Sequence, residues 1–259
     1  ASMIKINQKL DHPLEHKTEC LILACVEEKK PSGTLKKLSD ELTGVISHTF
    51  ENKRFNGKPG QALLLNSNGK ASNLLLVGIG KSKDVTAEKI CQAAGTAAKL
   101  AEQSNFKSIT ADLSAFEGIA KGKVGFYGEL AGAMAEGVGL ALYHFDNYKS
   151  RDEKDDPPSR IEKLTLLTAS KSRQASIEKS IARAEKIIDA VHTARDLISH
   201  PGNTATPTFL ADHAKKVARK NKITCKVLGQ KEMEKLGMGS LLGVSQGSDE
   251  PPALIALEY

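Results

Sequence analysis

A serine motif near the end of the chain is the first group of residues that could carry out catalysis. Residues 243–247, GVSQG, have the G-x-S-x-G spacing of a nucleophile elbow, in which a serine attacks an acyl carbon. That chemistry needs a helix directly after the serine and a histidine later in the chain. Pro251 and Pro252 follow closely, and the last of the seven histidines is His213. We therefore expect a glycine-rich turn before the next strand, with no nucleophilic Ser245.

A possible zinc motif lies near the start of the chain. Residues 12–16, HPLEH, have the H-x-x-E-H spacing of an inverted zinc-binding motif. Zinc binding needs both histidines on one helical face and a further carboxylate ligand. Pro13 is tolerated only in the first turn of a helix, which would place His12 outside that helix as its cap. The segment is therefore predicted to be a solvated loop.

A short glycine pair could bind phosphate. Gly78 and Gly80 follow an apolar run, as in the turn that cradles a dinucleotide. The third glycine of that fingerprint is missing, and the next helix is expected to start only near Thr86. The spacing therefore does not satisfy the dinucleotide-binding pattern.

The densest basic run is a candidate for contact with polyanions. Residues 213–222, HAKKVARKNK, would place four cations on one helical face: Lys215, Lys216, Arg219 and Lys220. No aromatic residues are interleaved to stack on bases. We expect a solvated helix face, with nucleic-acid binding as the weaker alternative.

Arg195 interrupts an apolar stripe and is followed by Asp196. The arginine could be aimed into a site. The favoured interpretation is a cation near the carboxyl end of a helix, stabilised by the helix dipole and paired locally.

Length and composition indicate a globular protein. A chain of 259 residues can bury a sizeable core, and a hydrophobic content of 40% shows no disorder signature. The formal net charge of +6 permits a polyanionic partner without demanding one. The start of the chain lacks the regions of a signal peptide, and no apolar run approaches the length of a membrane span. We expect a cytoplasmic protein that does not contact membranes.

The four cysteines are scattered along the chain. Cys20 and Cys25 are an odd number of residues apart on an expected strand, so their side chains should point to opposite faces of a sheet. They are expected to be free thiols that share neither a metal nor a disulfide.

Residues 1–150 alternate strand and helix patterns, which predicts a mixed α/β sandwich. The expected strands are 3–8, 19–26, 62–65, 74–79 and 108–113. The turn signal at 66–69 predicts a hairpin. The expected helices are 35–49, a helix capped by Thr86 with small apolar residues, and 127–145.

The second part of the chain starts after a charged, proline-containing segment, 147–160, which we interpret as a domain boundary. A strand at 161–168 and a long helix at 172–198 are expected next, and that helix would bridge two domains. Thr206 and Pro207 form a helix start, and 223–228 should be a half-buried strand. The apolar run 253–257 predicts a strand covered on both faces, as in a parallel sheet.

Several stretches resemble the leucyl aminopeptidase family. The segments ARDLISHPGNTATPTFLADHAKKVA (194–218) and LGMGSLLGVSQGSDEPPALIALEY (236–259) are similar to the start of its catalytic domain. Three further segments resemble its amino-terminal domain: FNGKPGQALLL (55–65), LLLVGIGKSKDVTAEKICQAAGTAAK (74–99) and AEGVGLALYHFDNYKS (135–150). The likeness covers nearly the whole chain. One departure is Ser199, where the family pattern leads us to expect Asn.

The resemblance implies an α/β chain with a macro-domain-like, mixed-sheet amino-terminal domain at 1–150. A linker and first strand at 151–171 would follow, and 172–259 would hold a bridging helix and the start of a metallopeptidase domain. Macro-domain relatives bind ADP-ribose, but fold analogy alone is a weak reason to expect a ligand here.

The resemblance also implies a cytosolic enzyme that removes amino-terminal residues, preferably leucine, from peptides. Family members use two divalent metal ions, zinc or manganese, and assemble as hexamers of two stacked trimers. The family's metal-binding motif, NTDAEGRL, does not occur between Ala1 and Tyr259. We therefore assign no catalytic, cofactor-binding or metal-binding residue in this sequence, and expect the metal ligands beyond Tyr259. The alternative is a non-enzymatic binding or assembly module for a nucleotide or nucleic acid, if the chain ends at Tyr259.

Overall fold

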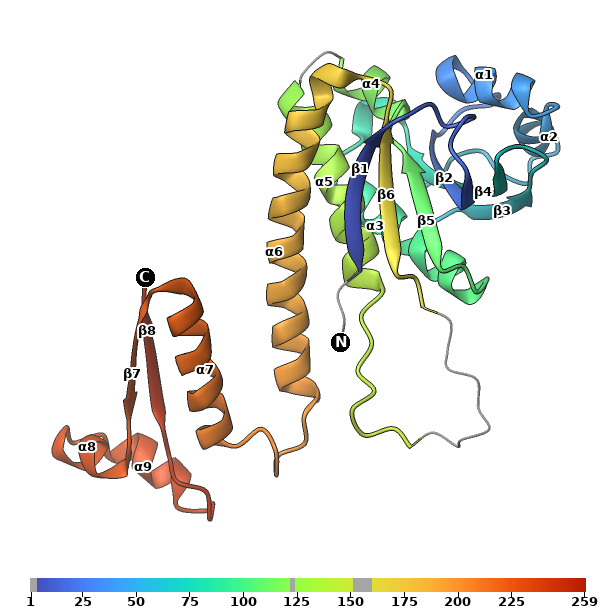
Figure 1. Cartoon of the computed structure of the whole chain (residues 1–259). Coiled ribbons are helices and arrows are strands. Elements are labelled where there is room, and N and C mark those ends of the chain that lie inside the picture. Colours follow the sequence, from blue (N-terminus) through green and yellow to red (C-terminus); the bar gives the residue numbers. More distant parts are fainter. Residues whose placement is uncertain (1–3, 122–123, 151–159) are drawn as a thin grey trace. The chain divides into compact units, whose positions relative to one another are not determined.

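The computed structural model describes residues 4–121, 124–150 and 160–259. The chain forms two compact units, Ala1–His192 and Thr193–Tyr259 (Figure 1). The long helix α6 (Gln174–Ser199) begins in the first unit and contributes its last turns to the second. This helix confirms the long helical pattern predicted over 172–198.

A six-stranded sheet forms the centre of the first unit. Its strands are β1 (Lys5–Leu10), β2 (Thr18–Val26), β3 (Ala62–Asn66), β4 (Ala71–Gly80), β5 (Ser108–Asp112) and β6 (Lys163–Thr168). The spatial order is β1-β6-β5-β2-β4-β3. Only the β3–β4 pair is antiparallel, which confirms the predicted hairpin, and the other neighbouring strands are parallel. The mixed sheet confirms the predicted α/β class.

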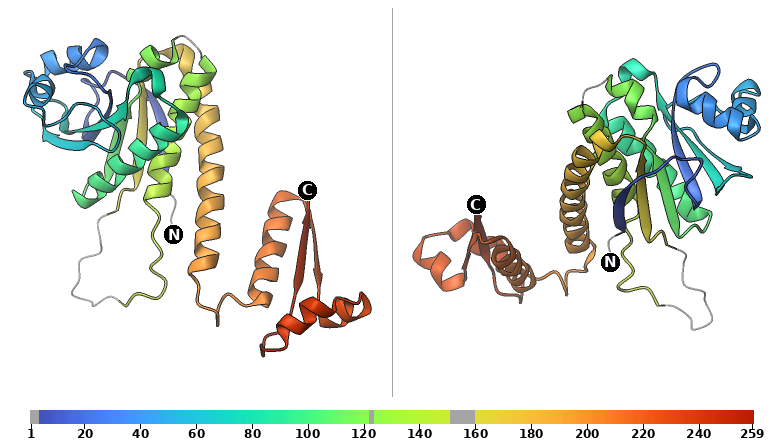
Figure 2. Two further views of the ribbon diagram at one scale, coloured as in Figure 1. Left: turned by 180° about the vertical axis from the view of Figure 1, so that it is seen from behind. Right: turned by 45° about the horizontal axis from the view of Figure 1, so that its top comes forward.

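Helices cover the two faces of this sheet in separate layers, as the two views in Figure 2 show. One layer consists of α1 (Gly33–Glu41) and α2 (Val45–Glu51), which pack through Leu38, Ile46 and Phe50. The other layer contains α3 (Ala87–Gln103), α4 (Ala115–Ala120), α5 (Val124–Ala141) and the first part of α6. Two short 3₁₀ turns, Ser82–Asp84 and Lys171–Arg173, connect these elements.

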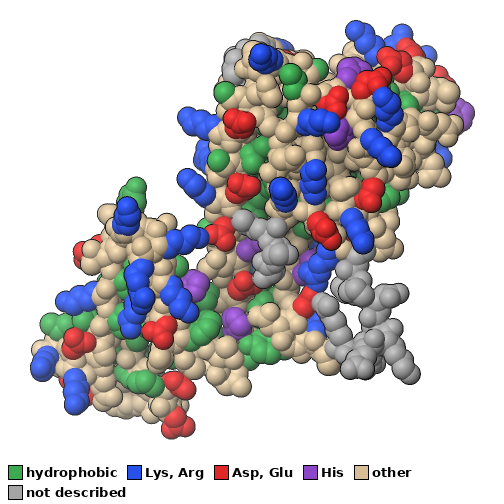
Figure 3. All heavy atoms as spheres, viewed as in Figure 1, with side chains coloured by type: hydrophobic (Ala, Val, Ile, Leu, Met, Phe, Trp, Pro, Cys, Tyr) green, Lys and Arg blue, Asp and Glu red, His purple; other side chains and the backbone are tan. Residues whose placement is uncertain are grey.

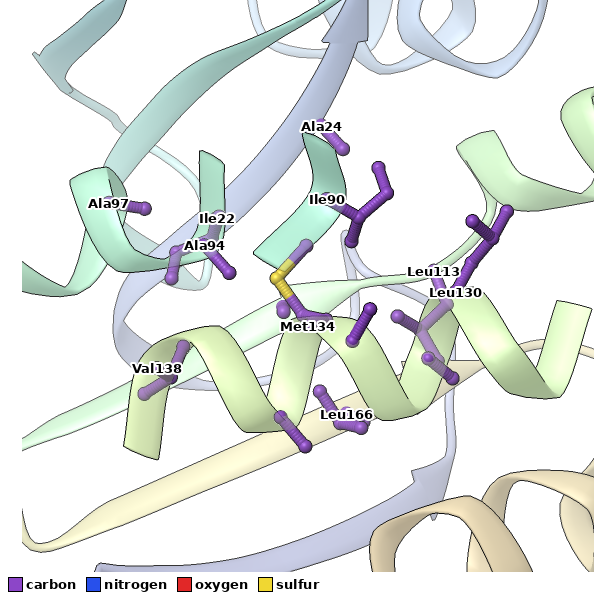
Figure 4. Packing of buried hydrophobic residues seen from close by; sticks show 14 of the residues in the cluster. Ile22, Ala24, Ile90, Ala94, Ala97, Leu113, Leu130, Met134, Val138 and Leu166 are labelled. Carbon is purple, nitrogen blue, oxygen red and sulfur yellow. The ribbon is translucent and has the colours of Figure 1, made fainter. Parts of the chain in front are cut away.

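Small residues allow α3 and α5 to pack closely. Figure 4 shows Met134 and Val138 of α5 facing Ala94 and Ala97 of α3. A Cβ atom on Gly137 would lie 2.1 Å from the carbonyl oxygen of Cys91, so only glycine fits there. The alanine-rich face of α3 is therefore buried, as its sequence predicted. The predicted cap is also present, because the Thr86 side chain accepts a hydrogen bond from the Lys89 amide.

Strand β2 is buried on both faces because it lies between β5 and β4 under both helical layers. Cys20 belongs to the core under α3 and α5, whereas Cys25 belongs to the core under α1 and α2. Both cysteines are free, and the prediction of opposite faces is confirmed. Burial raises the pKa of the Cys20 thiol to about 12 and also raises the pKa of Cys25.

The second unit is a smaller α/β assembly. It contains α7 (Pro207–Asn221), β7 (Thr224–Leu228), α8 (Gln230–Lys235), α9 (Gly239–Ser245) and β8 (Leu254–Glu258). The Thr206 hydroxyl accepts a hydrogen bond from the Phe209 amide, and Pro207 occupies the first turn of α7, as predicted. Strands β7 and β8 pair antiparallel.

Predicted elements in both units differ from the structure. The helix expected over 35–49 is divided into α1 and α2 because Thr43 and Gly44 adopt positive φ angles of 58° and 75°. Strand β8 was predicted to be covered on both faces within a parallel sheet. Within the residues that the structure describes, β8 pairs antiparallel with β7, so its pairing differs from the prediction, and Leu257 is 48% exposed. The predicted cover on both faces stays a prediction. Residues 151–159 of the predicted linker lie outside the described residues, so the domain boundary there stays a prediction.

Candidate functional site

The serine motif lies on a short helix rather than in the expected turn. Ser245 is the last residue of α9, and its hydroxyl donates a hydrogen bond to the Leu242 carbonyl over 2.8 Å. Glycines at 239 and 243 are thus tolerated within a single helical segment. The hydroxyl serves the local backbone.

The HPLEH segment forms a loop between β1 and β2, as predicted. His16 Nδ1 lies 3.0 Å from Asp11 Oδ2. Glu15 forms an ion pair with Lys70 on the neighbouring part of the surface. His12 Nδ1 accepts a hydrogen bond from the Leu14 amide over 3.4 Å. The two histidines and the glutamate therefore have structural partners within this loop region or beside it.

Glycines 78 and 80 end β4 and allow another backbone segment to approach. A Cβ atom on Gly78 would lie 1.9 Å from the Lys58 carbonyl oxygen. Gly80 has a φ of 80°. Their role in the structure is close packing and a turn, which explains the glycine pair without a phosphate.

The basic run occupies one face of α7, where Lys215, Lys216, Arg219 and Lys220 are exposed. Lys215 Nζ lies 3.4 Å from Asp212 Oδ1. Arg195 is partly buried near the end of α6. The structure therefore confirms the helix face predicted for the run, and the role of Arg195 stays a prediction.

The topology creates one crevice that the sequence did not reveal. Strands β2 and β5 are neighbours, but the chain leaves them in opposite directions, toward α1 and toward α4. Ligands of open α/β sheets bind where the strand order reverses, at the carboxyl ends of the strands. A cavity of about 280 Å³ lies there, and its lining includes Val26, Glu28, Ser32, Ser82, Ser114 and Ile119.

Hydroxyl groups and the Glu28 carboxylate are the polar side-chain groups that line this crevice. The Ser32 hydroxyl donates to Glu28 Oε1 over 2.9 Å and does not cap α1. Ser114 donates its amide and its hydroxyl to buried Asp112, whose pKa is raised by desolvation. The described residues that line the crevice include no Lys, Arg or His. This set can hydrogen-bond a small polar molecule, but it offers no cationic side chain for a phosphate.

A buried arginine fixes the α4 wall of the crevice. The Arg173 guanidinium lies 3.1 Å from Glu117 Oε2 and 5.2 Å from the centre of the Tyr127 ring. The Tyr127 hydroxyl donates to the Leu113 carbonyl over 3.2 Å, and burial raises the pKa of Tyr127 to about 12. These contacts hold α4 and α5 against the 3₁₀ turn that precedes α6.

A second, larger cavity of about 780 Å³ is a groove between α5 and α6 within the first unit. Glu129 and Glu136 line it from α5, and Lys179, Arg183 and Lys186 line it from α6. No sequence motif indicated this groove. Its two walls come from distant parts of the sequence, so their proximity could not be predicted. The sequence offered one signal of the walls, the helical spacing of the acidic residues on α5 and of the basic residues on α6.

The described residues contain no group of three or more His, Cys, Asp or Glu side chains that could hold a metal ion. They also contain no helix that is both long enough and apolar enough to cross a membrane. The fit of a metal centre to this part of the chain is therefore poor.

Comparisons with known protein families match both parts of the chain. Residues 22–152 match the model of the cytosol aminopeptidase family, N-terminal domain. Residues 192–259 match the model of the cytosol aminopeptidase family, catalytic domain. The second match begins within α6.

Individual proteins of this family also match the chain over nearly its whole length. The chain is 36% identical over 259 residues to a probable cytosol aminopeptidase of Geobacter sp. (strain M21), covering 99% of the chain and 50% of that protein. A solved tomato leucine aminopeptidase mutant, K354E, has 26% identity and a TM-score of 0.83, covering 98% of the chain and 50% of that structure. The bottromycin maturation enzyme BotP in complex with Mn shares the fold, with 24% identity and a TM-score of 0.68, covering 93% of the chain and 45% of BotP. The chain thus spans about half the length of the relatives that it matches.

Proposed function

Because the chain belongs to the cytosol aminopeptidase family, as its sequence resemblance predicted, we propose that it forms the amino-terminal half of a leucyl aminopeptidase. The complete enzyme would remove amino-terminal residues, preferably leucine, from peptides. The observation that carries this proposal is the likeness to the tomato leucine aminopeptidase, which extends over 98% of the chain with a TM-score of 0.83.

The two units would have different roles in that enzyme. The first unit, with its buried mixed sheet, would act as a regulatory or assembly domain. The second unit would begin the catalytic domain, since residues 192–259 match that part of the family. Helix α6 would connect the two, and the division into 1–150, 151–171 and 172–259 is part of this proposal.

The proposed enzyme would use two divalent metal ions, manganese or zinc. Bound metal ions would supply Lewis-acid chemistry at the peptide carbonyl. The described residues do not fit such a centre, so we assign its ligands to the half of the enzyme that follows the matched segment. The BotP structure with Mn supports a divalent ion in a protein of this fold.

The proposed assembly is a hexamer of two stacked trimers in the cytoplasm. The family name supports the cytosolic location. The hexamer rests on the family resemblance. Light scattering of the purified full-length protein would test it, and a monomeric mass at micromolar concentration would contradict it.

The activity is tested with the full-length protein and leucyl amide. We expect leucine release that a chelator abolishes and that added manganese or zinc restores. Intact mass spectrometry of the same sample would first establish whether the polypeptide exceeds the 27.8 kDa of this sequence. A longer polypeptide that releases no leucine with either metal would contradict the aminopeptidase proposal.

A further inference from the structure

The groove between α5 and α6 has the dimensions of a ligand site. Its volume of about 780 Å³ lies within the roughly 300–1,000 Å³ of small-molecule pockets. Every residue that lines it belongs to the first unit and precedes the segment that matches the catalytic domain. The residues that would contact a ligand in this groove therefore belong to the first unit.

Small residues bring the two helices close together and form the floor of the groove. A Cβ atom on Gly128 would lie 2.0 Å from Ser176 Oγ, and one on Gly132 would lie 3.0 Å from Ser180 Cβ. Gly132, Ser176 and Ser180 line the groove directly. The floor consequently has short side chains, while longer side chains rise on both sides.

Charges of opposite sign form the two walls. Glu129 and Glu136 are two helical turns apart on α5, and Lys179, Arg183 and Lys186 share one face of α6. None of these five side chains forms an ion pair within 4 Å with another residue that the structure describes. Figure 3 shows side chains of both charges close together on the surface of the first unit. The carboxylates and the cations remain available to a bound molecule.

We propose that this groove binds a linear zwitterion such as a short peptide. The ammonium group of the ligand would meet Glu129 and Glu136, and its carboxylate would meet the cations of α6. A ligand of one charge would be attracted by one wall and repelled by the other. A zwitterion is attracted by both walls, so charge complementarity selects it.

The test uses the full-length protein and ε-aminocaproic acid, a linear zwitterion that has no peptide bond to hydrolyse. Isothermal titration calorimetry should detect binding to the wild-type protein. Caproic acid lacks the ammonium group and hexylamine lacks the carboxylate, so each should bind about tenfold more weakly if one charge-assisted contact is lost. Equal binding of the three compounds would overturn the proposal, as would no binding of the zwitterion at millimolar concentration.

Variants separate this groove from other binding positions. Glu136→Gln and Arg183→Gln should each weaken zwitterion binding about tenfold, because each removes one charged contact. Glu178→Gln is the matched control, since Glu178 is exposed on α6 but does not line the groove. Wild-type affinity in both groove variants would place the ligand elsewhere and overturn the proposal.

Leucine release should be unchanged in these variants, so the result is independent of the proposed activity. Circular dichroism would confirm that each variant is folded. A protein that binds the zwitterion but releases no leucine would retain this groove proposal and contradict only the aminopeptidase proposal.

Discussion

Strands β2 and β8 both come from unbroken apolar runs, but they have different surroundings. In β2, the residues Cys20 to Cys25 are at most 4% exposed, because a helical layer covers each face. In β8, Leu254 and Ile255 are partly buried and Leu257 is 48% exposed. The two strands therefore have the same apolar sequence pattern but differ in how deeply their side chains are buried in this chain.

This difference teaches what an apolar run does and does not specify. The run specifies a strand with hydrophobic side chains on both faces. The number of neighbouring strands and the layers that cover them come from distant parts of the chain. For β2, those parts are β4, β5, α1 and α3. For β8, the described partner strand is β7.

The largest expected effect is in β2. Ile22 is 0% exposed in the core under α3 and α5, so Ile22→Ala should lower the free energy of unfolding by about 2–5 kcal/mol. Urea denaturation followed by tyrosine fluorescence would measure the change. Ile22→Val should cost only about 0.5–1.5 kcal/mol. A loss below about 2 kcal/mol for Ile22→Ala would show that β2 is less tightly packed than its burial indicates.

A smaller loss of stability is expected for a substitution at the contact between α3 and α5, the helices that cover one face of β2. Gly137→Ala would place a Cβ atom 2.1 Å from the Cys91 carbonyl oxygen and push the helices apart. The expected cost is about 1–3 kcal/mol, measured by the same denaturation. Gly118→Ala is the control, since a Cβ atom there meets nothing within 4 Å. Equal stability of the two variants would contradict the close packing described for this layer.

Glu19, near the start of β2, should make a pH-dependent contribution to the stability of the fold. The amides of Ser108 and Lys107 donate to the Glu19 carboxylate over 2.8 and 2.9 Å, and these bonds lower its pKa. A lowered pKa in the folded state stabilises the fold above the ordinary pKa of 4.5, and this stabilisation is lost as the pH falls. Glu19→Gln should therefore reduce the dependence of stability on pH below that value. An unchanged acid profile would contradict this role.

The smallest effect is expected in β8. In the 259-residue chain Leu257 is 48% exposed, so Leu257→Ala in a polypeptide of this length should change the free energy of unfolding by no more than about 1 kcal/mol. Hydrogen exchange of the β7 and β8 amides would measure the local change. A loss as large as that of Ile22→Ala would show that β8 is covered in solution, and the contrast with β2 would disappear.

Much of the fold could be predicted because local patterns carried it. The Thr86 and Thr206 caps, the β3–β4 hairpin and the long α6 helix all have short-range signals. The division between α1 and α2 was missed because the apolar repeat continues through Gly44, although that glycine was a signal for a break. The partner of β8 was missed because strand pairing depends on contacts that no local pattern encodes.

The candidate sites were harder to predict than the fold. The sequence motifs directed attention to Ser245, to HPLEH and to the glycines near residue 80, all of which have structural roles. The α5–α6 groove needs Glu136 and Arg183 to share a cavity, although they are far apart in the chain. The packing of Gly128, Gly132 and Gly139 against α6 helps to bring those walls together.

The two thiols of β2 give the fold a built-in chemical label for each helical layer. A buried thiol reacts with an alkylating reagent only when its surroundings open, because burial disfavours the reactive thiolate. The rate at Cys20 would therefore record detachment of the α3–α5 layer, and the rate at Cys25 would record detachment of the α1–α2 layer. Cys91 and Cys225, which are partly exposed, would react first and provide the internal reference.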